Sequence, residues 1–290
     1  MESYYEYCSK GSLPEQAGQV LTLAEKSVRP LVAKGLPEKL SHLIVATTCP
    51  DTLAPSLGQT LIEKFNTPLS GCHSIDIVQG CAGGVSALIL ASQLAEVNRS
   101  SVLVVLADAA AKSTSHSNRL SKNFGNGSFS CLISYQHSEL GLIHSKSIHY
   151  KGLTEVVNIN LGHDADRIIM LERNTMNTDP RKHLGLQMNN NLAIKLLRKA
   201  ERFFQDFIKE TGIPDVVIPH QVNPLILAHL AGVFRKYRTE FINVADQAGN
   251  CGVASIGIAL DSIKDSMKGK KIFVGSFGTG GVITAGLWRT

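Results

Sequence analysis

The chain of 290 residues contains an internal repeat, which limits the folds that it can adopt. Cys81 and Cys251 each begin a run of small and apolar residues typical of a buried helix, and Ser101 and Lys271 each begin an apolar run typical of a strand. The same number of residues separates the members of both pairs, so two elements repeat together. A third pair repeats in the same order: HLIVATTCP (42–50) and PDVVIPHQV (214–222). We therefore expect a duplicated strand–helix–strand unit in stacked layers, with a cleft between two similar halves.

The first copy contains the strongest candidate for a reactive residue. Cys81 follows the apolar strand 74–78 and opens a helix within DIVQGCAGG (76–84). Unpaired backbone N–H groups and the helix dipole at such a position favour the thiolate, which is the nucleophilic form of cysteine. Glycines beside it allow a substrate to come close. The alternative is that Cys81 is a small buried apolar residue.

The second copy contains two groups that could assist this thiol. His220 ends the apolar strand in PDVVIPHQVNP (214–224), and Asn250 lies in a turn before a helix of small residues. An imidazole can transfer protons or stabilise an enolate, and an amide N–H can bind a carbonyl oxygen. Taken singly, His220 could equally be a core histidine and Asn250 an ordinary turn residue. Cys251, in the position equivalent to Cys81, is predicted to be structural because His220 and Asn250 lie in its own half.

The chain resembles the β-ketoacyl-[acyl carrier protein] synthase III group of the thiolase superfamily. The matching segments occur in the family's order: IVATTCPD (44–51), DIVQGCAGG (76–84), FGNGSFSCLI (124–133), PHQVN (219–223), QAGNCGVASIGIALD (247–261) and FGTGG (277–281). The resemblance implies an α/β fold with a duplicated five-layer α-β-α-β-α core, divided here into halves at 1–150 and 151–290.

The same resemblance implies the site and the reaction. Cys81, His220 and Asn250 would form the catalytic triad, and the backbone of Cys81 and of the Gly278–Thr279 turn would form an oxyanion hole. The implied reaction is acylation of Cys81 followed by decarboxylative Claisen condensation with a malonyl thioester, in fatty-acid or secondary-metabolite synthesis. The substrates would be thioesters of coenzyme A or acyl carrier protein, without a metal or cofactor. Two alternatives are an acyltransferase that passes the acyl group to an oxygen or nitrogen nucleophile, and a subunit of a heteromeric condensing enzyme.

Several residues depart from the family pattern. Members normally begin with a longer segment that holds a central strand and contacts to coenzyme A, which here is missing or reduced to residues 1–13. Thr279 replaces one residue of the usual triple glycine, Gly84 replaces a common aromatic residue, and Pro224 and Leu225 stand where an arginine is usual. Because a lost strand would expose a sheet edge, we expect a second subunit, as a homodimer or heterodimer.

A basic stripe marks the helix expected at about 188–210. Lys195, Arg198, Lys199 and Arg202 recur at helical spacing on one side of it. The usual interpretation of such a stripe is a solvated surface, and the functional one is a dock for an acidic carrier protein. The net charge of +5 fits both, and no nucleic-acid-binding motif accompanies it.

Composition favours a globular α/β protein in a reducing compartment. The chain is 43% hydrophobic and 18% charged, and its six cysteines show no Cys-x-x-Cys pair. The apolar runs look too short for a membrane span, the N-terminus does not resemble a signal peptide, and we expect a cytoplasmic protein. We also expect a helix at 14–34, a polar loop at 112–126 beside the site, and a cap or substrate entrance at 151–186.

Overall fold

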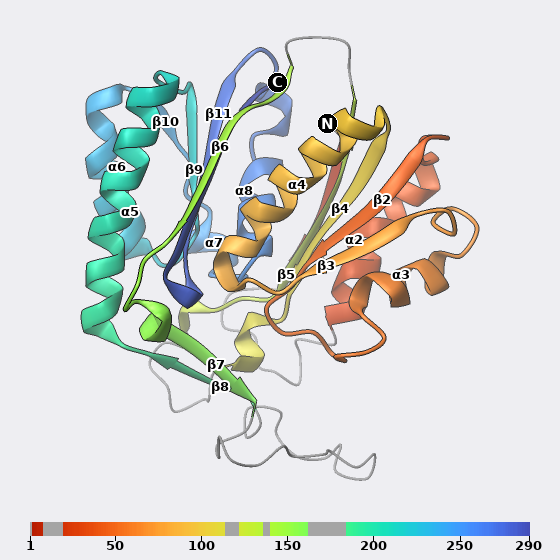
Figure 1. Cartoon of the computed structure of the whole chain (residues 1–290), viewed down its shortest axis with the longest axis horizontal. Coiled ribbons are helices and arrows are strands. Elements are labelled where there is room, and N and C mark those ends of the chain that lie inside the picture. Colours follow the sequence, from red (N-terminus) through yellow and green to blue (C-terminus); the bar gives the residue numbers. More distant parts are fainter. Residues whose placement is uncertain (1, 8–19, 114–121, 136–139, 162–183) are drawn as a thin grey trace.

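Two five-stranded sheets and three layers of helices form the core of the described part of the chain, beside a two-stranded sheet. The computed structural model describes residues 2–7, 20–113, 122–135, 140–161 and 184–290. Figure 1 shows the layers edge on, with helices outside each sheet and a further helical layer between the sheets. This is the five-layer α-β-α-β-α arrangement expected from the sequence.

The two sheets have the same strand order, which confirms the duplication. The first sheet runs β3-β2-β4-β5-β1 and the second β10-β9-β11-β12-β6. In each sheet the first three strands are parallel and the last two antiparallel. The first sheet contains β1 (Glu2–Tyr7), β2 (Leu40–Ala46), β3 (His73–Ile77), β4 (Ser101–Asp108) and β5 (Gly127–Ser134). The second contains β6 (Gly141–His149), β9 (Val216–Pro219), β10 (Glu240–Phe241), β11 (Lys271–Gly278) and β12 (Val282–Arg289).

The helices pack in three layers. The outer layer on the first sheet contains α2 (Val20–Lys34) and α3 (Leu57–Phe65). The outer layer on the second sheet contains α5 (Asn190–Thr211) and α6 (Pro224–Phe234). Between the sheets lie α4 (Gly83–Asn98) and α8 (Ala254–Asp261), with the short α7 (Ala245–Ala248) beside them.

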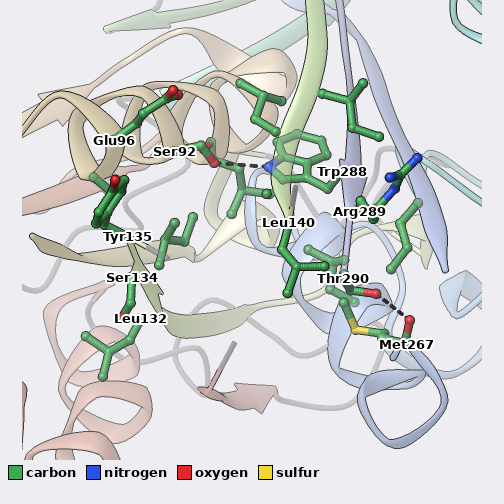
Figure 2. A pocket seen from close by; sticks show the side chains of 18 of the residues that line it. Ser92, Glu96, Leu132, Ser134, Tyr135, Leu140, Met267, Trp288, Arg289 and Thr290 are labelled. Atoms are coloured by element: carbon green, nitrogen blue, oxygen red, sulfur yellow. Dashed lines mark hydrogen bonds between the residues drawn. The ribbon is translucent and has the colours of Figure 1, made fainter. Parts of the chain in front are cut away.

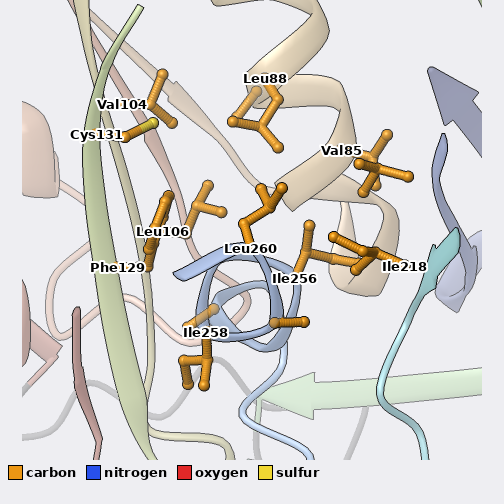
Figure 3. Close-up of a cluster of buried hydrophobic side chains, with 14 of the residues drawn as sticks. Val85, Leu88, Val104, Leu106, Phe129, Cys131, Ile218, Ile256, Ile258 and Leu260 are labelled. Atoms are coloured by element: carbon orange, nitrogen blue, oxygen red, sulfur yellow. The ribbon is translucent and has the colours of Figure 1, made fainter. Parts of the chain in front are cut away.

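Every residue of α8 is buried, and α4 is mostly buried in its first half, because these helices lie between the two sheets. Val85 and Leu88 of α4 and Ile256 of α8 belong to one buried cluster, which also contains Phe129 of the first sheet and Ile218 of the second (Figure 3). Burial of each such side chain contributes about 1.5–3 kcal/mol. By length and composition alone, the segment Gly80–Asn98 could cross a membrane, but half of it is buried inside the protein as a core helix.

Local sequence signals fix several helix ends. The Ser56 hydroxyl accepts the Gln59 N–H and the Gln59 side chain accepts the Ser56 N–H, which forms a capping box at the start of α3. Asn223 caps α6 and is followed by a proline at its first turn. The asparagine of PHQVN is therefore a helix cap.

The structure corrects two expectations about the chain's organisation. The first sheet does not lack its fifth strand, because Glu2–Tyr7 pairs antiparallel with β5 as β6 pairs with β12. The chain also changes sheets before residue 150, because β6 belongs to the second sheet. The predicted polar loop and cap fall partly on 114–121 and 162–183, and the first residues of the predicted helix on 14–19, all outside the described residues. The described part of the cap contains a single 3₁₀ turn at Thr154–Val156, then β7 (Val157–Leu161), which pairs antiparallel with β8 (Leu184–Met188).

Candidate active site

Cys81 lies where the chain passes from β3 into the central helix α4. A single turn of 3₁₀ helix, Gly80–Ala82, makes this connection. Gly80 has a φ of +57°, which glycine adopts with little strain. The Ser276 hydroxyl of β11 donates to the Cys81 carbonyl at 2.8 Å and so fixes the turn against the second sheet. Cys81 as a residue is partly exposed, whereas its thiol is enclosed by the surrounding chain.

The end of β11 forms one wall around the thiol. A Cβ atom placed on Gly278 would lie 3.0 Å from Cys81 Cβ and 3.1 Å from its Sγ, so a larger residue here would require the Cys81 side chain to shift by a few tenths of an ångström. Thr279, the next residue, packs its side chain beside Gly80, because a Cβ atom placed on Gly80 would lie 2.4 Å from Thr279 Cβ. Gly278 and Thr279 therefore lie beside Cys81, where the sequence analysis expects the oxyanion hole.

The electrostatic surroundings of Cys81 differ from our expectation. Burial and, secondly, the Asp108 carboxylate raise the pKa of the Cys81 thiol to about 11, although hydrogen bonds from Thr279 and Cys81 oppose this rise. The expectation that the helix start makes the thiolate the favoured form is therefore wrong. The desolvation of an anion enclosed between two sheets outweighs the favourable backbone dipoles.

His220 lies at the end of β9, next to β11 in the second sheet. Its backbone N–H donates to the Gly275 carbonyl at 2.8 Å, three residues before the glycine that touches Cys81. The side chain is 1% exposed, and burial lowers the pKa of His220 to about 4, so the imidazole is neutral near pH 7. Its buried Nδ1 has no hydrogen-bond partner in the described part of the chain, which is unusual for a buried polar atom.

Gln221 explains why the strand ends where it does. Its amide donates to the carbonyls of Pro219 and Ile242 at 2.7 and 3.2 Å, and its oxygen accepts the Val244 N–H at 2.8 Å. These bonds join the exit of β9 to the segment that follows β10. They hold His220 in place from the neighbouring residue.

Asn250 lies in the turn that precedes α8. Its backbone pairs with the first half of the chain, since its N–H donates to the Asn123 carbonyl at 2.7 Å and its carbonyl accepts the Gly125 N–H at 2.9 Å. Its side-chain oxygen accepts the Gly252 N–H at 3.0 Å. With the oxygen occupied in this way, the amide NH₂ is the group that Asn250 can offer to a ligand.

Asp108 connects the segment after β2 to the start of α8, and the sequence analysis missed this residue. Its fully buried carboxylate accepts the Thr47 hydroxyl at 3.0 Å, the Thr48 N–H at 2.7 Å and the Val253 N–H at 2.9 Å. Burial raises the pKa of Asp108, while these hydrogen bonds favour its charged form. A carboxylate at the end of the apolar strand LVVLAD was the signal available in the sequence.

Contacts between the two copies bring the three predicted residues to one end of the sheets. A Cβ on Gly84, near the start of the Cys81 helix, would lie 2.7 Å from the Val253 carbonyl, three residues after Asn250. The β11 strand carries the other link, because it pairs with β9 before His220 and ends against Cys81. The contact of Gly84 with Val253 therefore links the Cys81 helix to the Asn250 turn. The contact of Gly278 with Cys81 links it to the strand beside His220.

The other predicted positions lie apart from this site. Lys195, Arg198, Lys199 and Arg202 are all exposed on the outer helix α5, and Lys199 Nζ lies 4.3 Å from the centre of the Tyr150 ring. Cys251 is fully buried in the central core. In the ranges that the structure describes, no three His, Cys, Asp or Glu side chains are grouped as metal ligands would be.

A cavity of about 1170 Å³ opens at the opposite end of the sheets. Its lining includes Ser134, which pairs with the first residue of β4, and Trp288, whose indole N–H donates to the Ser92 hydroxyl at 3.0 Å (Figure 2). Asp108, by contrast, is the last residue of β4. This cavity contains none of the predicted site residues.

Comparisons with known proteins agree with the geometry. The family model described as 3-oxoacyl-[acyl-carrier-protein] synthase III matches residues 75–151, and the model of its C-terminal part matches residues 210–290. Together they cover more than half of the chain; the first match contains Cys81, and the second contains His220 and Asn250.

Individual relatives have the same description. A β-ketoacyl-[acyl-carrier-protein] synthase III of Methylococcus capsulatus is 26% identical over 256 residues, which are 84% of this chain and 75% of that protein. The one from Rickettsia canadensis is 29% identical over 237 residues, 79% of this chain and 69% of that protein. A crystal structure of a 3-oxoacyl-(acyl-carrier-protein) synthase III superposes with a TM-score of 0.80 at 21% identity, covering 93% of this chain and 85% of that one, and it shows the shared fold.

Proposed function

The chain belongs to the 3-oxoacyl-[acyl-carrier-protein] synthase III family of acyl-transferring condensing enzymes, and from this premise we propose that Cys81, His220 and Asn250 carry out the two halves of its reaction. The observation that carries the proposal is the contact of the Gly278–Thr279 segment with Cys81, at the end of the strand beside His220. It joins a nucleophile from one copy of the fold to assisting groups from the other.

In the first half-reaction Cys81 accepts the acyl group. Its sulfur forms a bond to the thioester carbonyl carbon, and the oxyanion accepts hydrogen bonds from the backbone N–H groups of Cys81 and Thr279. The carbon–sulfur bond to the carrier then breaks, and the carrier leaves as a thiol with the proton of Cys81. Because the resting pair is a thiol and a neutral imidazole, His220 relays this proton during the attack.

In the second half-reaction His220 and Asn250 bind the carbonyl oxygen of a malonyl thioester. The bond to its carboxylate breaks, carbon dioxide leaves, and the electron pair stays as an enolate that the two side chains stabilise. The enolate carbon attacks the acyl carbonyl, the bond to Cys81 breaks, and its thiolate takes up a proton from solvent. The unpartnered Nδ1 of His220 and the oriented amide of Asn250 support this role.

The test separates the two half-reactions in the variant Asn250→Ala. We expect acylation at Cys81 to persist and release of labelled carbon dioxide to fall about 10²–10³-fold, as for the loss of one oxyanion donor. Asn98→Ala, an exposed position at the end of α4, is the matched control and should retain both steps. Normal decarboxylation in Asn250→Ala would overturn the proposal. Acyl transfer to an alcohol or amine by a wild-type protein that never decarboxylates would favour the simple acyltransferase.

We further propose that the basic stripe on α5 docks an acidic acyl carrier protein or the phosphate of a coenzyme A thioester. Its four cations are exposed on an outer layer and are not needed for the core. Lysine and arginine at helical spacing present one continuous positive surface to an approaching anion. This surface would raise the rate of encounter more than the intrinsic affinity.

A second subunit is proposed at β3, the edge strand that leads to Cys81. On its outer side β3 pairs with no strand of the described residues, and Val78 just after it is 66% exposed. Such an edge is normally covered, and a cytoplasmic dimer would cover it beside the site. Light scattering with and without a co-expressed condensing-enzyme partner distinguishes a homodimer from a heterodimer, and a monomer in both samples would contradict the proposal.

A further inference from the structure

The cavity at the far end of the sheets lies between the two halves of the fold. Its volume of about 1170 Å³ is at the upper end of the usual size of small-molecule pockets, about 300–1,000 Å³. Leu132 of β5 lines it from the first sheet, and Val274 of β11 and Trp288 of β12 line it from the second (Figure 2). The space is therefore formed where the two sheets meet, and it is separate from the Cys81 site.

The interior of the cavity is apolar, and its hydroxyl groups are already bonded within the protein. Leu88 lines it and belongs to the buried central core. The Ser92 hydroxyl donates to the Leu88 carbonyl at 2.8 Å and accepts the Trp288 indole N–H at 3.0 Å. The Ser134 hydroxyl is bonded to that of Ser101 at 2.8 Å. Because burial of a polar group without a partner is costly, this interior suits the apolar part of a ligand.

The rim of the cavity also has apolar side chains. Leu140 and Ile143 line it and are 48% and 45% exposed, so apolar surface continues from the interior to the solvent. Thr290 at the rim is bonded within the protein, since its hydroxyl donates to the Met267 carbonyl and its backbone oxygen accepts the Gly269 N–H at 2.7 Å. A ligand that enters here meets apolar surface first.

Charged side chains at the cavity are mostly cations. Lys264, Lys268 and Arg289 line it, and Glu96 is the one acidic side chain among the lining residues that the structure describes. Lys264 Nζ lies 3.3 Å from the Asp261 carboxylate, so its charge is partly compensated. Lys268 and Arg289 are therefore the cations best suited to an anionic group of a ligand.

We propose that this cavity binds an amphipathic anion of the long-chain carboxylate class. Its alkyl chain lies against Leu88 and Trp288, and its carboxylate lies at the rim near Lys268 and Arg289. The site shares no residue with the Cys81 site, so it does not depend on the proposed reaction.

The experiment uses the fluorescence of Trp288, which is the only tryptophan in the sequence and lines the cavity. The full chain is titrated with dodecanoate below its micelle concentration, and calorimetry gives the number of molecules bound. We expect a saturable fluorescence change with one dodecanoate per chain. Burial of each methylene strengthens binding by up to about fourfold, so octanoate should bind at least about tenfold more weakly. Dodecanol, which has the same chain and no charge, should bind about 3–10-fold more weakly than dodecanoate.

Variants test the rim and the interior separately. Lys268→Glu should weaken dodecanoate binding about 3–10-fold and leave dodecanol binding unchanged. Lys236→Glu, at an exposed position outside the cavity, is the matched control and should bind as wild type does. Ala95→Leu adds volume to the cavity wall and should weaken both ligands at least about tenfold. If Ala95→Leu does not fold, Lys268→Glu and the comparison with octanoate decide the question.

Three results would overturn the inference. The first is the absence of saturable dodecanoate binding below the micelle concentration. The second is dodecanol binding as tight as that of dodecanoate, which would remove the role of the cations. The third is loss of binding in Cys81→Ala, which would place the chain in the other site. Intact binding in a protein that forms no acyl adduct on Cys81 would support the cavity site and contradict the proposed reaction alone.

Discussion

The two copies of the fold place equivalent cysteines in opposite surroundings. Cys81 and Cys251 occupy matching positions after strands of the same sheet order, yet Cys81 is partly exposed and Cys251 is completely buried. The Cys251 thiol donates to the Ala248 carbonyl at 3.3 Å, and Gly125 packs against its sulfur. Cys81 lies against the turn at Gly278–Thr279, and Cys251 fills a gap in the core.

The difference originates at the strand ends that follow the cysteines. The repeat aligns Gly278, the last residue of β11, with Asp108, the last residue of β4. Gly278 leaves space against Cys81, whereas the Asp108 carboxylate binds the Val253 N–H at the helix start after Cys251. The N-terminus of a helix attracts an anion, and in the second copy the Asp108 carboxylate already occupies this position. In the first copy the corresponding place remains available to a substrate.

Alkylation of the two thiols should reveal the largest difference between the copies. In the native protein iodoacetamide should modify Cys81 and leave Cys251 unmodified until the chain unfolds. Since only the thiolate reacts and the pKa of Cys81 is about 11, its rate should rise about tenfold per pH unit through the neutral range. Peptide mapping by mass spectrometry follows both sites. A rate that levels off below pH 8.5 would contradict the raised pKa.

Removal of the Asp108 charge, which the first copy contributes to the helix start of the second, should produce an intermediate effect. Asp108→Asn keeps the shape of the side chain but weakens the hydrogen bonds from Thr48 and Val253, so we expect a loss of about 1–3 kcal/mol in the free energy of unfolding. It also removes a negative charge near Cys81, so the alkylation profile should move to lower pH. Urea denaturation and the same alkylation assay measure the two effects. Asp246→Asn, an exposed position, is the control, and a profile moving to higher pH would be incompatible with this account.

Charge reversal on the outer helices should give the smallest difference between the two copies, measured as the apparent KM for a carrier-bound substrate. Surface charge pairs contribute about 0–1 kcal/mol each and are screened by salt. Reversal of the four α5 cations to glutamate should therefore raise the apparent KM for a carrier-bound substrate severalfold at low salt, with a smaller effect at high salt and on short free thioesters. The control reverses the exposed cations of the equivalent outer helix α2, which are Lys26, Arg29 and Lys34. Equal losses from both helices would reduce the α5 stripe to a solvated surface.

The architecture could be predicted from the sequence because two similar segments of sequence fold into two similar sheets. The paired apolar segments became matching strands, and the small-residue runs after Cys81 and Cys251 became the two central helices. The segment at 2–7 was not recognised as a strand because its position is defined only by pairing with β5, far along the chain. The sheet boundary was misplaced for the same reason, since β6 is assigned by its partner β12.

The chemistry of the site was less accessible from sequence. The position of Cys81 before a helix suggested a lowered pKa, but burial and Asp108 act through tertiary contacts that no local pattern contains. The side chain of Thr279 was visible only as a departure from a glycine motif, and its packing against Gly80 was not predicted. The alignment of Asp108 with Gly278 within the repeat was available and could have identified the carboxylate.

The most direct test of the account is intact-mass analysis after incubation with acyl thioesters of coenzyme A and of acyl carrier protein. It compares wild type, Cys81→Ala and Cys251→Ala under the same conditions. We expect one acyl mass on wild type and on Cys251→Ala, and none on Cys81→Ala, because only Cys81 combines partial exposure with the donors at Gly278–Thr279. An adduct that persists in Cys81→Ala and disappears in Cys251→Ala would contradict the assignment of the two copies.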